Sequence, residues 1–247
     1  MKIALLTTQT PHHAFFVREI VARFEDVHVF AENSSLKAPF ETFHHYETER
    51  DSFEREFWFK GANPQLDVFA PVTAFDTMNG IDAIRALADW RADIAIVFGT
   101  GRLSEAVLKN GPQCFLNLHG GDPEDYRGLD THLWAIYHGD FDGLVTTLHT
   151  LNPMIDDGDI CLQEDVHLSA GMPLYALRRA NTETCIRLTL AALAAFRDQG
   201  AVPSRKQRRK GRYYSFMPSP LKDICRRKFD NYTKALVNDA EGEHPDE

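Results

Sequence analysis

Hydrophobic and polar residues follow two distinct spacings along this chain. Short runs of β-branched and aliphatic residues, typical of strands, occupy positions 2–7, 27–31, 66–72, 94–98 and 114–119. Between them we predict helices at 11–24, 78–90 and 105–109, and a further helix at 40–60, a segment dense in acids and aromatics. The same signals predict a helix at 131–138, strands at 144–151 and 160–168, and a helix at 173–199. Strands and helices therefore alternate for most of the chain.

This alternation favours a parallel sheet with helices on its faces. The runs at 94–98 and 115–118 are almost continuously apolar, as central strands covered on both faces are. The predicted fold class is α/β: a Rossmann-like, mostly parallel sheet flanked by helices, with a short C-terminal extension. Because the pattern changes after Gly200, we expect one domain at 1–200 and a basic extension with an acidic tail at 201–247.

Composition adds a core and an uneven charge. The 247 residues are 43% hydrophobic, enough to bury a sizeable core, and the formal net charge is −9. Ten Lys or Arg residues stand between Arg205 and Lys228 against the single Asp223, and five acids fall in the last nine residues. The basic block could meet an anionic partner, mediate a homodimer or be a solvated extension. No RNA-reading motif accompanies it, so no nucleic-acid partner is expected.

Cysteine usage and hydropathy bear on location. The four cysteines form no C-x-x-C pair, which favours reduced thiols over a disulfide frame or a zinc cluster. No segment reaches the roughly 18 consecutive apolar residues of a membrane span. We therefore expect a soluble, cytoplasmic protein without membrane attachment. The doublets His12-His13 and His44-His45 are poorly placed to chelate one ion, so no metal is expected.

Two common catalytic signatures are missing. Thr7 to His13, after the first strand, contains no glycine, which disfavours a dinucleotide-binding phosphate loop. No G-x-S-x-G elbow appears, so a hydrolase serine nucleophile lacks support. Gly99 and Gly101 follow a predicted strand, and such glycines let a flat ligand approach the backbone closely.

The most informative stretch is Asn117-Leu118-His119, at the end of a predicted strand. Residues two apart on a strand face the same way, so the amide and the imidazole would open together at the sheet edge. An amide can donate to an oxyanion and an imidazole can accept a proton. The acidic turn Ile155 to Asp159 comes later, and Asp156 could complete the set. A buried polar pair capping the strand is the alternative interpretation.

Several segments in the same order resemble the formyltransferase family that uses 10-formyltetrahydrofolate. They are Ala92 to Gly99, Leu116 to His119, Tyr126 to Gly128, Thr131 to Ile136 and Ile155 to Ile160. The resemblance covers roughly residues 1–200 and makes them a formyltransferase catalytic domain. It implies that Asn117, His119 and Asp156 are the catalytic triad, and it leaves open whether His119 or Asp156 is the kinetic base.

The resemblance also implies where the ligands bind. The pterin of 10-formyltetrahydrofolate, the co-substrate, would lie against the backbone of Thr100, Gly101, Arg102 and Leu103 and against the loop that leads to Asp156. Candidate residues for the acceptor substrate are Arg127, Asp130, His132 and His13.

Within this family the sugar N-formyltransferases are most similar. The acceptor of the glycinamide ribonucleotide enzymes is disfavoured because Thr7 to His13 lacks their glycine-rich loop. The methionyl-tRNA enzymes append a barrel of about a hundred residues, whereas 47 residues follow Gly200. We therefore expect a nucleotide-linked amino sugar as substrate, in bacterial surface polysaccharide biosynthesis. The alternatives are another amine acceptor, a 10-formyltetrahydrofolate hydrolase, or a non-catalytic folate or nucleotide binder.

Overall fold

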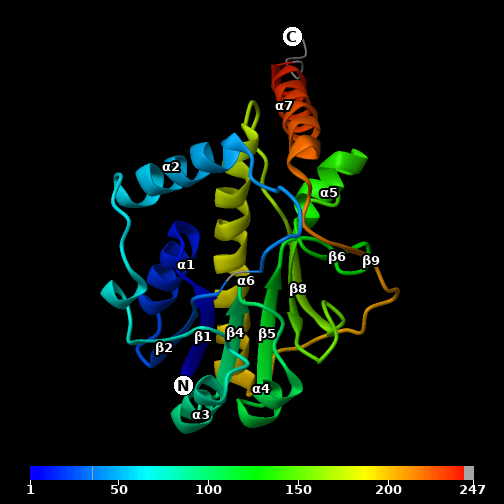
Figure 1. Cartoon of the computed structure of the whole chain (residues 1–247). Coiled ribbons are helices and arrows are strands. Elements are labelled where there is room, and N and C mark those ends of the chain that lie inside the picture. The colour runs from blue at the N-terminus through cyan, green and yellow to red at the C-terminus, as the bar shows by residue number, and fades with distance from the viewer. Residues whose placement is uncertain (35, 242–247) are drawn as a thin grey trace, which may run out of the picture.

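The computed structural model describes residues 1–34 and 36–241, and a seven-stranded sheet forms its centre (Figure 1). The strands lie in the order β3-β2-β1-β4-β5-β7-β8. Their bounds are β1 Ile3–Thr8, β2 Val27–Glu32, β3 Val72–Phe75, β4 Ile94–Phe98, β5 Cys114–His119, β7 Val145–Thr150 and β8 Ile160–Asp165. The first five in the order are parallel, whereas β7 and β8 are antiparallel to their neighbours. The predicted fold class is confirmed.

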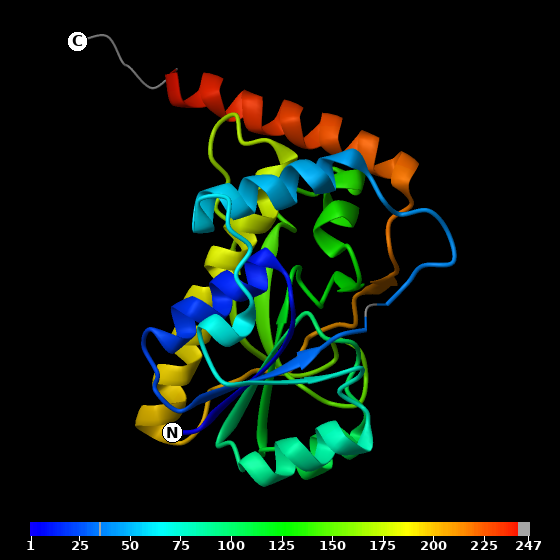
Figure 2. The ribbon, with the colours of Figure 1, turned by 60° about the vertical axis from the view of Figure 1, so that its left-hand side comes forward.

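Helices cover both faces of this sheet. They are α1 Pro11–Val21, α2 His45–Phe59, α3 Ile81–Trp90, α4 Glu105–Asn110, α5 Thr131–His138, α6 Leu177–Gln199 and α7 Ser219–Glu241, with short 3-10 turns η1 Leu66–Val68 and η2 Leu174–Ala176. Helices α1 and α6 lie on one face and α3 and α4 on the other (Figures 1 and 2). Helix α1 begins where the sequence predicts, because Thr10 caps it and Pro11 stands in its first turn.

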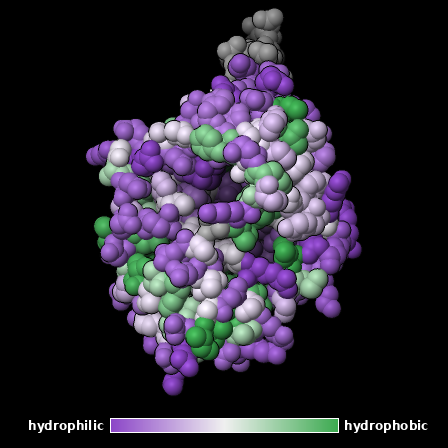
Figure 3. Space-filling model, in the orientation of Figure 1, coloured by the Kyte–Doolittle hydropathy of each residue, from purple (hydrophilic) through white to green (hydrophobic). Residues whose placement is uncertain are grey.

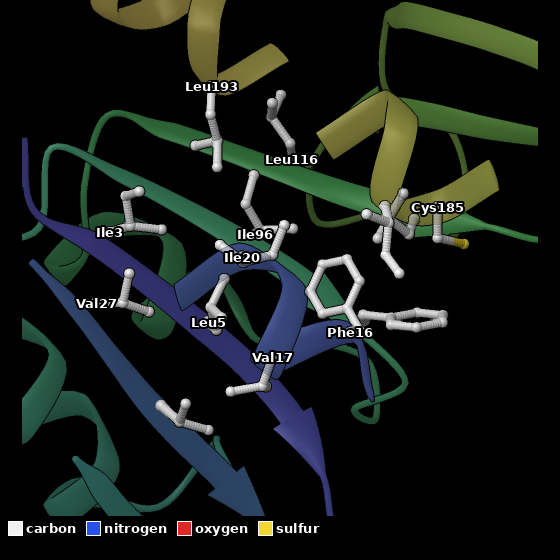
Figure 4. Close-up of a cluster of buried hydrophobic side chains, with 14 of the residues drawn as sticks. Ile3, Leu5, Phe16, Val17, Ile20, Val27, Ile96, Leu116, Cys185 and Leu193 are labelled. Carbon is white, nitrogen blue, oxygen red and sulfur yellow. The ribbon is translucent and has the colours of Figure 1, made fainter. Parts of the chain in front are cut away.

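The main core lies between the sheet and the α1/α6 layer. Phe16 and Ile20 of α1 pack over Leu5 of β1, and Leu193 of α6 packs over Leu116 of β5 (Figure 4). All five side chains are at most 1% exposed. A second cluster fills the α3/α4 side; its buried members include Ala95, Val97, Leu87 and Val107. The core thus fixes β4 and β5, whose carboxyl ends carry the polar residues of interest.

One predicted strand is wrong and several elements were not anticipated. Residues 66–68 form the turn η1, and the strand expected at 66–72 begins only at Val72. Pro71 accounts for the shift: it has no N–H for a ladder, and its carbonyl accepts the Val29 N–H at 2.9 Å as the strand begins. The sequence patterns also did not indicate helix α7 or the two-stranded sheet of β6, Tyr126–Gly128, and β9, Arg212–Tyr214.

Residues beyond α6 return to the sheet's carboxyl edge. Strand β9 pairs in parallel with β6, and α7 packs against α5 through buried residues that include Phe229 (Figure 1). Arg205 forms a two-pronged ion pair with the buried carboxylate of Glu124, with N···O distances of 3.1 and 2.9 Å. An ion pair and a strand pairing therefore attach the basic segment to the part of the chain before Gly200.

Stability should depend on pH through this contact. The hydrogen bonds from Arg205 lower the pKa of Glu124 to about 2. A lowered carboxyl pKa stabilises the fold above the unfolded value of about 4.3, and that stabilisation is lost as the pH falls toward about 2. We expect Glu124→Gln to lower the free energy of unfolding by roughly 1–3 kcal/mol near neutral pH and by about half as much near about pH 3. Urea denaturation at both pH values checks this; an equal loss at both would contradict it.

Candidate active site

Polar residues line one pocket at the carboxyl ends of β4 and β5. This pocket, called the larger pocket below because a smaller one adjoins it, has a volume of about 330 Å³. Asn117, His119 and Asp156 all line it. Its other walls come from the end of β4 and the loop 99–103, from residues 128–131 and from the loop 151–156. The structure thus brings the three predicted catalytic residues together at the edge where open α/β sheets hold their ligands.

Asn117 is oriented by a histidine on the neighbouring strand. The antiparallel register of β5 and β7 places His149 directly opposite Asn117, and the two side chains are 3.1 Å apart. The Nδ1–H of His149 donates to the Thr150 carbonyl at 2.8 Å, so its Nε2 can accept from the Asn117 amide. One amide hydrogen of Asn117 is thereby used, and the other remains for a ligand.

A backbone carbonyl sets the tautomer of His119. Its Nε2 lies 2.7 Å from the Tyr126 carbonyl, which can only accept, so Nε2 carries a hydrogen. In the neutral ring, Nδ1 is then the unprotonated nitrogen. It lies 3.6 Å from Oδ1 of Asp156, and the His119 side chain is 5% exposed. A proton accepted at Nδ1 would be held beside a carboxylate.

Asp156 has a constrained backbone and a stabilised charge. Its φ of 47° is left-handed, an uncommon conformation for a residue with a side chain. Oδ2 accepts the Gly128 N–H at 2.8 Å, while Oδ1 faces His119 and, at 3.5 Å, His149. Burial alone would raise the pKa of Asp156, but the positive charge that the His119 and His149 rings carry when protonated, together with the Gly128 N–H, outweighs it and holds that pKa well below its usual range. The group is therefore a carboxylate near neutral pH.

The predicted cofactor-binding residues Thr100, Gly101, Arg102, Leu103 and Asp156 all line this larger pocket. The buried side chain of Glu32 and the exposed side chain of Asn79 already hold the loop 99–103. Glu32 accepts the Gly101 N–H at 2.6 Å, and Asn79 donates to the Arg102 carbonyl at 2.9 Å. The Arg102 guanidinium donates to the Pro153 carbonyl, which joins the two loops on either side of the pocket. The backbone of Leu103 makes no such contact with another described residue, so it is open to a ligand.

A smaller pocket of about 200 Å³ adjoins the larger one. The two share Gly120, Asp130 and Thr131, and Gly120 directly follows His119 in the sequence. Figure 3 shows a hollow between α2 and α5 with mostly hydrophilic residues around it. The remaining lining residues are Tyr46, Arg50, His132, Leu133, Leu174, Leu177, Arg178 and Asn181. Arg178 is paired with Glu54 and Asp51, and Arg50 is paired with Asp51, so both arginines that line this pocket already have acidic partners.

The four predicted acceptor residues have different surroundings. Asp130 lines both pockets, with a φ of 51° and one carboxylate oxygen bound to the Met217 N–H. His132 lines the smaller pocket, and burial lowers its pKa to about 4, so it is neutral near pH 7. Arg127 lines neither pocket; it donates to the Ile155 carbonyl and lies 3.7 Å from the Asp157 carboxylate.

His13 lies behind the pocket wall. Its ring stands so close to Gly99 that a Cβ there would come within 2.4 Å of it. Burial lowers the pKa of His13 to about 3, and its Nδ1 lies within hydrogen-bond distance of the Thr8 and Thr10 hydroxyls, at 2.8 and 2.9 Å. His13 therefore supports the glycine wall as a neutral side chain.

Four residues at the site escaped sequence reasoning: His149, Glu32, Gln207 and Tyr213. His149 could have been found only with the β5/β7 register, which the local pattern does not contain. Glu32 carried a usable signal, because a carboxylate at the end of a buried strand requires partners. Gln207 and Tyr213 lie in the extension, where no helical or strand periodicity suggested a return to the site.

The histidine doublets do not form a metal centre in the part of the chain that is described. His44 pairs with Asp223 at 3.0 Å, and the rings of His12 and His13 contact one another. Among residues 1–34 and 36–241, no three His, Cys, Asp or Glu side chains gather as metal ligands. Within the same residues, no helix combines the length and apolar character needed to cross a membrane.

Sequence comparison finds methionyl-tRNA formyltransferases among the curated relatives. Methionyl-tRNA formyltransferase from Bacteroides fragilis is 25% identical over 182 residues, which are 73% of this chain and 56% of the relative. The enzyme of that name from Agathobacter rectalis is 32% identical over 105 residues, which are 42% of this chain and 32% of the relative. The chain thus spans about half the length, or less, of these curated relatives.

Solved structures share the fold at low identity. One from Mycobacterium tuberculosis, described as a likely sugar N-formyltransferase, has a TM-score of 0.60 and 16% identity over 87% of this chain and 75% of its own. An N-formyltransferase from Helicobacter canadensis has a TM-score of 0.56 and 14% identity over 87% and 71%. A family model described as formyl transferase matches residues 3–184, well over half of the chain. The chain therefore belongs to the formyl transferase family.

Proposed function

We propose that this protein transfers the formyl group of 10-formyltetrahydrofolate to the amine of a nucleotide-linked amino sugar. The observation that carries the proposal is the convergence of Asn117, His119 and Asp156 on one pocket. Family membership supports the formyl chemistry. The Helicobacter canadensis relative was crystallised with folinic acid and dTDP-3-aminofucose, which supports a folate donor and an amino-sugar acceptor.

Each residue of the triad matches one need of the reaction. When the amine nitrogen attacks the formyl carbon, the carbonyl oxygen becomes negative and the nitrogen positive. The free amide hydrogen of Asn117 can stabilise that oxygen, and Nδ1 of His119 can take the proton that the nitrogen loses. The bond between the formyl carbon and N10 then breaks, and N10 receives a proton as tetrahydrofolate leaves. Asp156 stabilises the imidazolium that exists between these two proton transfers.

His119 is the better base of the pair. The pKa of Asp156 is held well below its usual range, and a carboxylate that binds protons so weakly is a poor base near neutral pH. The unprotonated Nδ1 of His119 has no donor among the described residues, whereas its Nε2 is committed to Tyr126. The proposed assignment is therefore His119 as base and Asp156 as its electrostatic partner.

The larger pocket suits the folate. Its glycine-containing wall at 99–101 admits a flat ring, and the open backbone of Leu103 offers a donor and an acceptor. Leu36, Met154 and Tyr213 are 61%, 52% and 52% exposed, and all three line this pocket. Solvent-exposed apolar side chains from three separate segments gathered around one opening favour an aromatic ligand portion there.

The smaller pocket suits the amino-sugar ring. Its polar lining can hydrogen-bond hydroxyl groups, and it meets the larger pocket at Gly120, next to His119. A ring placed there would present its amine to the formyl group in the larger pocket. The carboxylate of Asp130, which lines both pockets, is placed to contact that amine.

Incubation with 10-formyltetrahydrofolate and a panel of amino-sugar nucleotides tests the proposal. The panel contains dTDP- and UDP-linked sugars with the amine at C3 or C4, and mass spectrometry detects a product heavier by one formyl group. We expect such a product from at least one acceptor. Formate without formylated sugar would instead support the hydrolase, and no turnover with intact folate binding would support the non-catalytic binder.

Tyr213 should affect folate binding in particular. Its ring lies over Gly128, whose added Cβ would come within 2.7 Å of it, and faces the pocket opening. Loss of aromatic contact removes about 1–2 kcal/mol of binding, so we expect Tyr213→Ala to weaken tetrahydrofolate affinity about tenfold. Fluorescence titration measures this. Phe57→Ala removes an equally exposed aromatic residue of α2, which does not line the pocket, and should leave the affinity unchanged.

Asn181 should affect the acceptor instead. Its Oδ1 accepts the Thr146 hydroxyl at 2.6 Å, and because Asn181 lines the smaller pocket, its amide nitrogen can donate to a ligand there. We expect Asn181→Ala to raise the KM of the amino-sugar nucleotide about tenfold, the value of one lost hydrogen bond, while the tetrahydrofolate affinity stays within about twofold. Steady-state kinetics and the same titration separate the two. A change in folate affinity alone would show that the pockets are assigned to the wrong ligands.

A further inference from the structure

The loop that carries Asp156 is held between two parts of the chain. On its inner side, Thr150 of β7 binds it twice: the Thr150 N–H donates to the Asp159 carbonyl, and the Asp159 N–H donates to the Thr150 hydroxyl, both at 2.8 Å. On its outer side runs the basic segment 205–212, which leads to β9. Arg205 forms an antiparallel bridge with Ile160, where the loop ends.

Gln207 makes the most direct contact across this outer side. Its Nε2 lies 2.9 Å from the carbonyl oxygen of Asp156 and 2.9 Å from that of Gly158. A primary amide has two hydrogens, so one side chain can satisfy both carbonyls. The two carbonyls flank Asp157, and their common donor fixes the backbone on either side of the turn.

The hydrogen bond from Gln207 holds Asp156 in a strained backbone conformation. A left-handed φ costs a residue with a side chain on the order of 1 kcal/mol or more, and it persists only where the surroundings impose it. The carboxylate is then aimed at His119 over 3.6 Å. Without the Gln207 amide, the Asp156 carbonyl would need a water molecule as its hydrogen-bond donor. The backbone could then relax to an unstrained φ, which would turn the carboxylate away from His119.

We propose that Gln207 is a positioning residue for Asp156, so that the segment beyond residue 200 completes the active site. The inference rests on the proposed function of the triad. Lys210 and Arg127 support the same turn electrostatically, because both lie near the Asp157 carboxylate, at 3.4 and 3.7 Å. Gln207 differs from them because it binds the backbone of Asp156 itself.

Three variants separate positioning from simple packing. Gln207→Met keeps the length of the side chain and removes both hydrogen bonds. Gln207→Glu keeps the size but sets a carboxylate against two carbonyl oxygens, which repel it. Lys206→Met is the matched control, because Lys206 is an exposed neighbour whose side chain makes no hydrogen bond or ion pair with a described residue.

Hydrogen–deuterium exchange of residues 152–159 measures the tether without any acceptor. We expect exchange there to be about tenfold faster in Gln207→Met and faster still in Gln207→Glu, with the core strands and the Lys206→Met control unchanged. Because Met preserves the packing, unchanged exchange in Gln207→Met would overturn the proposal. Thermal melting confirms that the variants are folded.

Kinetics measure the consequence. With the best acceptor of the panel, we expect Gln207→Met to lower kcat about tenfold and to leave the KM for 10-formyltetrahydrofolate within about threefold, since a displacement below 1 Å suffices to slow a positioned reaction. Asp156→Asn is measured alongside. If Asp156→Asn loses activity and Gln207→Met does not, this proposal alone fails. If Asp156→Asn keeps full kcat, the proposed function of the triad fails.

Discussion

His119→Ala should lower the rate of formyl transfer by about a hundredfold or more while the chain still folds. The substitution removes the Nδ1 lone pair that lies 3.6 Å from Asp156, and no other described side chain in that position can accept the amine proton near neutral pH. Asp156 cannot replace it, because the pKa of that carboxyl is held well below its usual range. The loss should appear in kcat rather than in folate affinity.

His167→Ala provides the matched control for this prediction. His167 is exposed near β8 and α7 and lines neither the larger nor the smaller pocket. Its removal should leave kcat unchanged. Steady-state rates of product formation, followed by mass spectrometry, measure both variants. A His119→Ala enzyme within about threefold of the original rate would exclude His119 as the base.

Gly158→Ala should reduce both stability and activity. An added Cβ would lie 1.5 Å from the Thr150 carbonyl oxygen and 2.5 Å from its carbon, and both are backbone atoms of β7 that cannot rotate away. The loop must therefore move out, which breaks its two bonds to Thr150 and displaces Asp156. We expect a loss of about 2–4 kcal/mol in the free energy of unfolding and at least about a tenfold loss in kcat.

Gly80→Ala tests whether this effect is specific to the loop. The nearest atom to a Cβ at Gly80 is the Thr77 carbonyl oxygen at 3.4 Å, an ordinary contact, and its φ of −71° suits alanine. We expect its denaturation midpoint and its kcat to stay close to those of the original chain. If Gly158→Ala unfolded at the same urea concentration as Gly80→Ala, the close contact between the loop and β7 would not determine the position of Asp156.

The parts of the fold that follow from local pattern could be predicted from the sequence. The apolar runs at 94–98 and 114–119 became β4 and β5, and the cap and proline at Thr10 and Pro11 mark the start of α1. The run at 66–72 misled because its apolar content indicates burial, whereas Pro71 determines where hydrogen bonding to β2 can begin. Hydrophobic periodicity does not show at which residue this hydrogen bonding begins.

The residues of the site also differ in whether local sequence pattern could reveal them. Asn117 and His119 could be found because two residues of one strand share a face whatever the tertiary structure is. His149 could not, since it meets Asn117 only through an antiparallel register that depends on the whole connection between β5 and β7. Gln207 lies 51 positions from Asp156, and its contact depends on how a segment without periodicity crosses the sheet edge.

A structure of the protein crystallised with 5-formyltetrahydrofolate, a stable analogue of the donor, tests the central claim most directly. The claim predicts a pterin against the backbone of residues 100–103, with the folate's N10 beside Asn117 and His119 and its benzoyl ring near Tyr213. A folate bound outside the larger pocket, or one whose N10 lies beyond the reach of both Asn117 and His119, would contradict it.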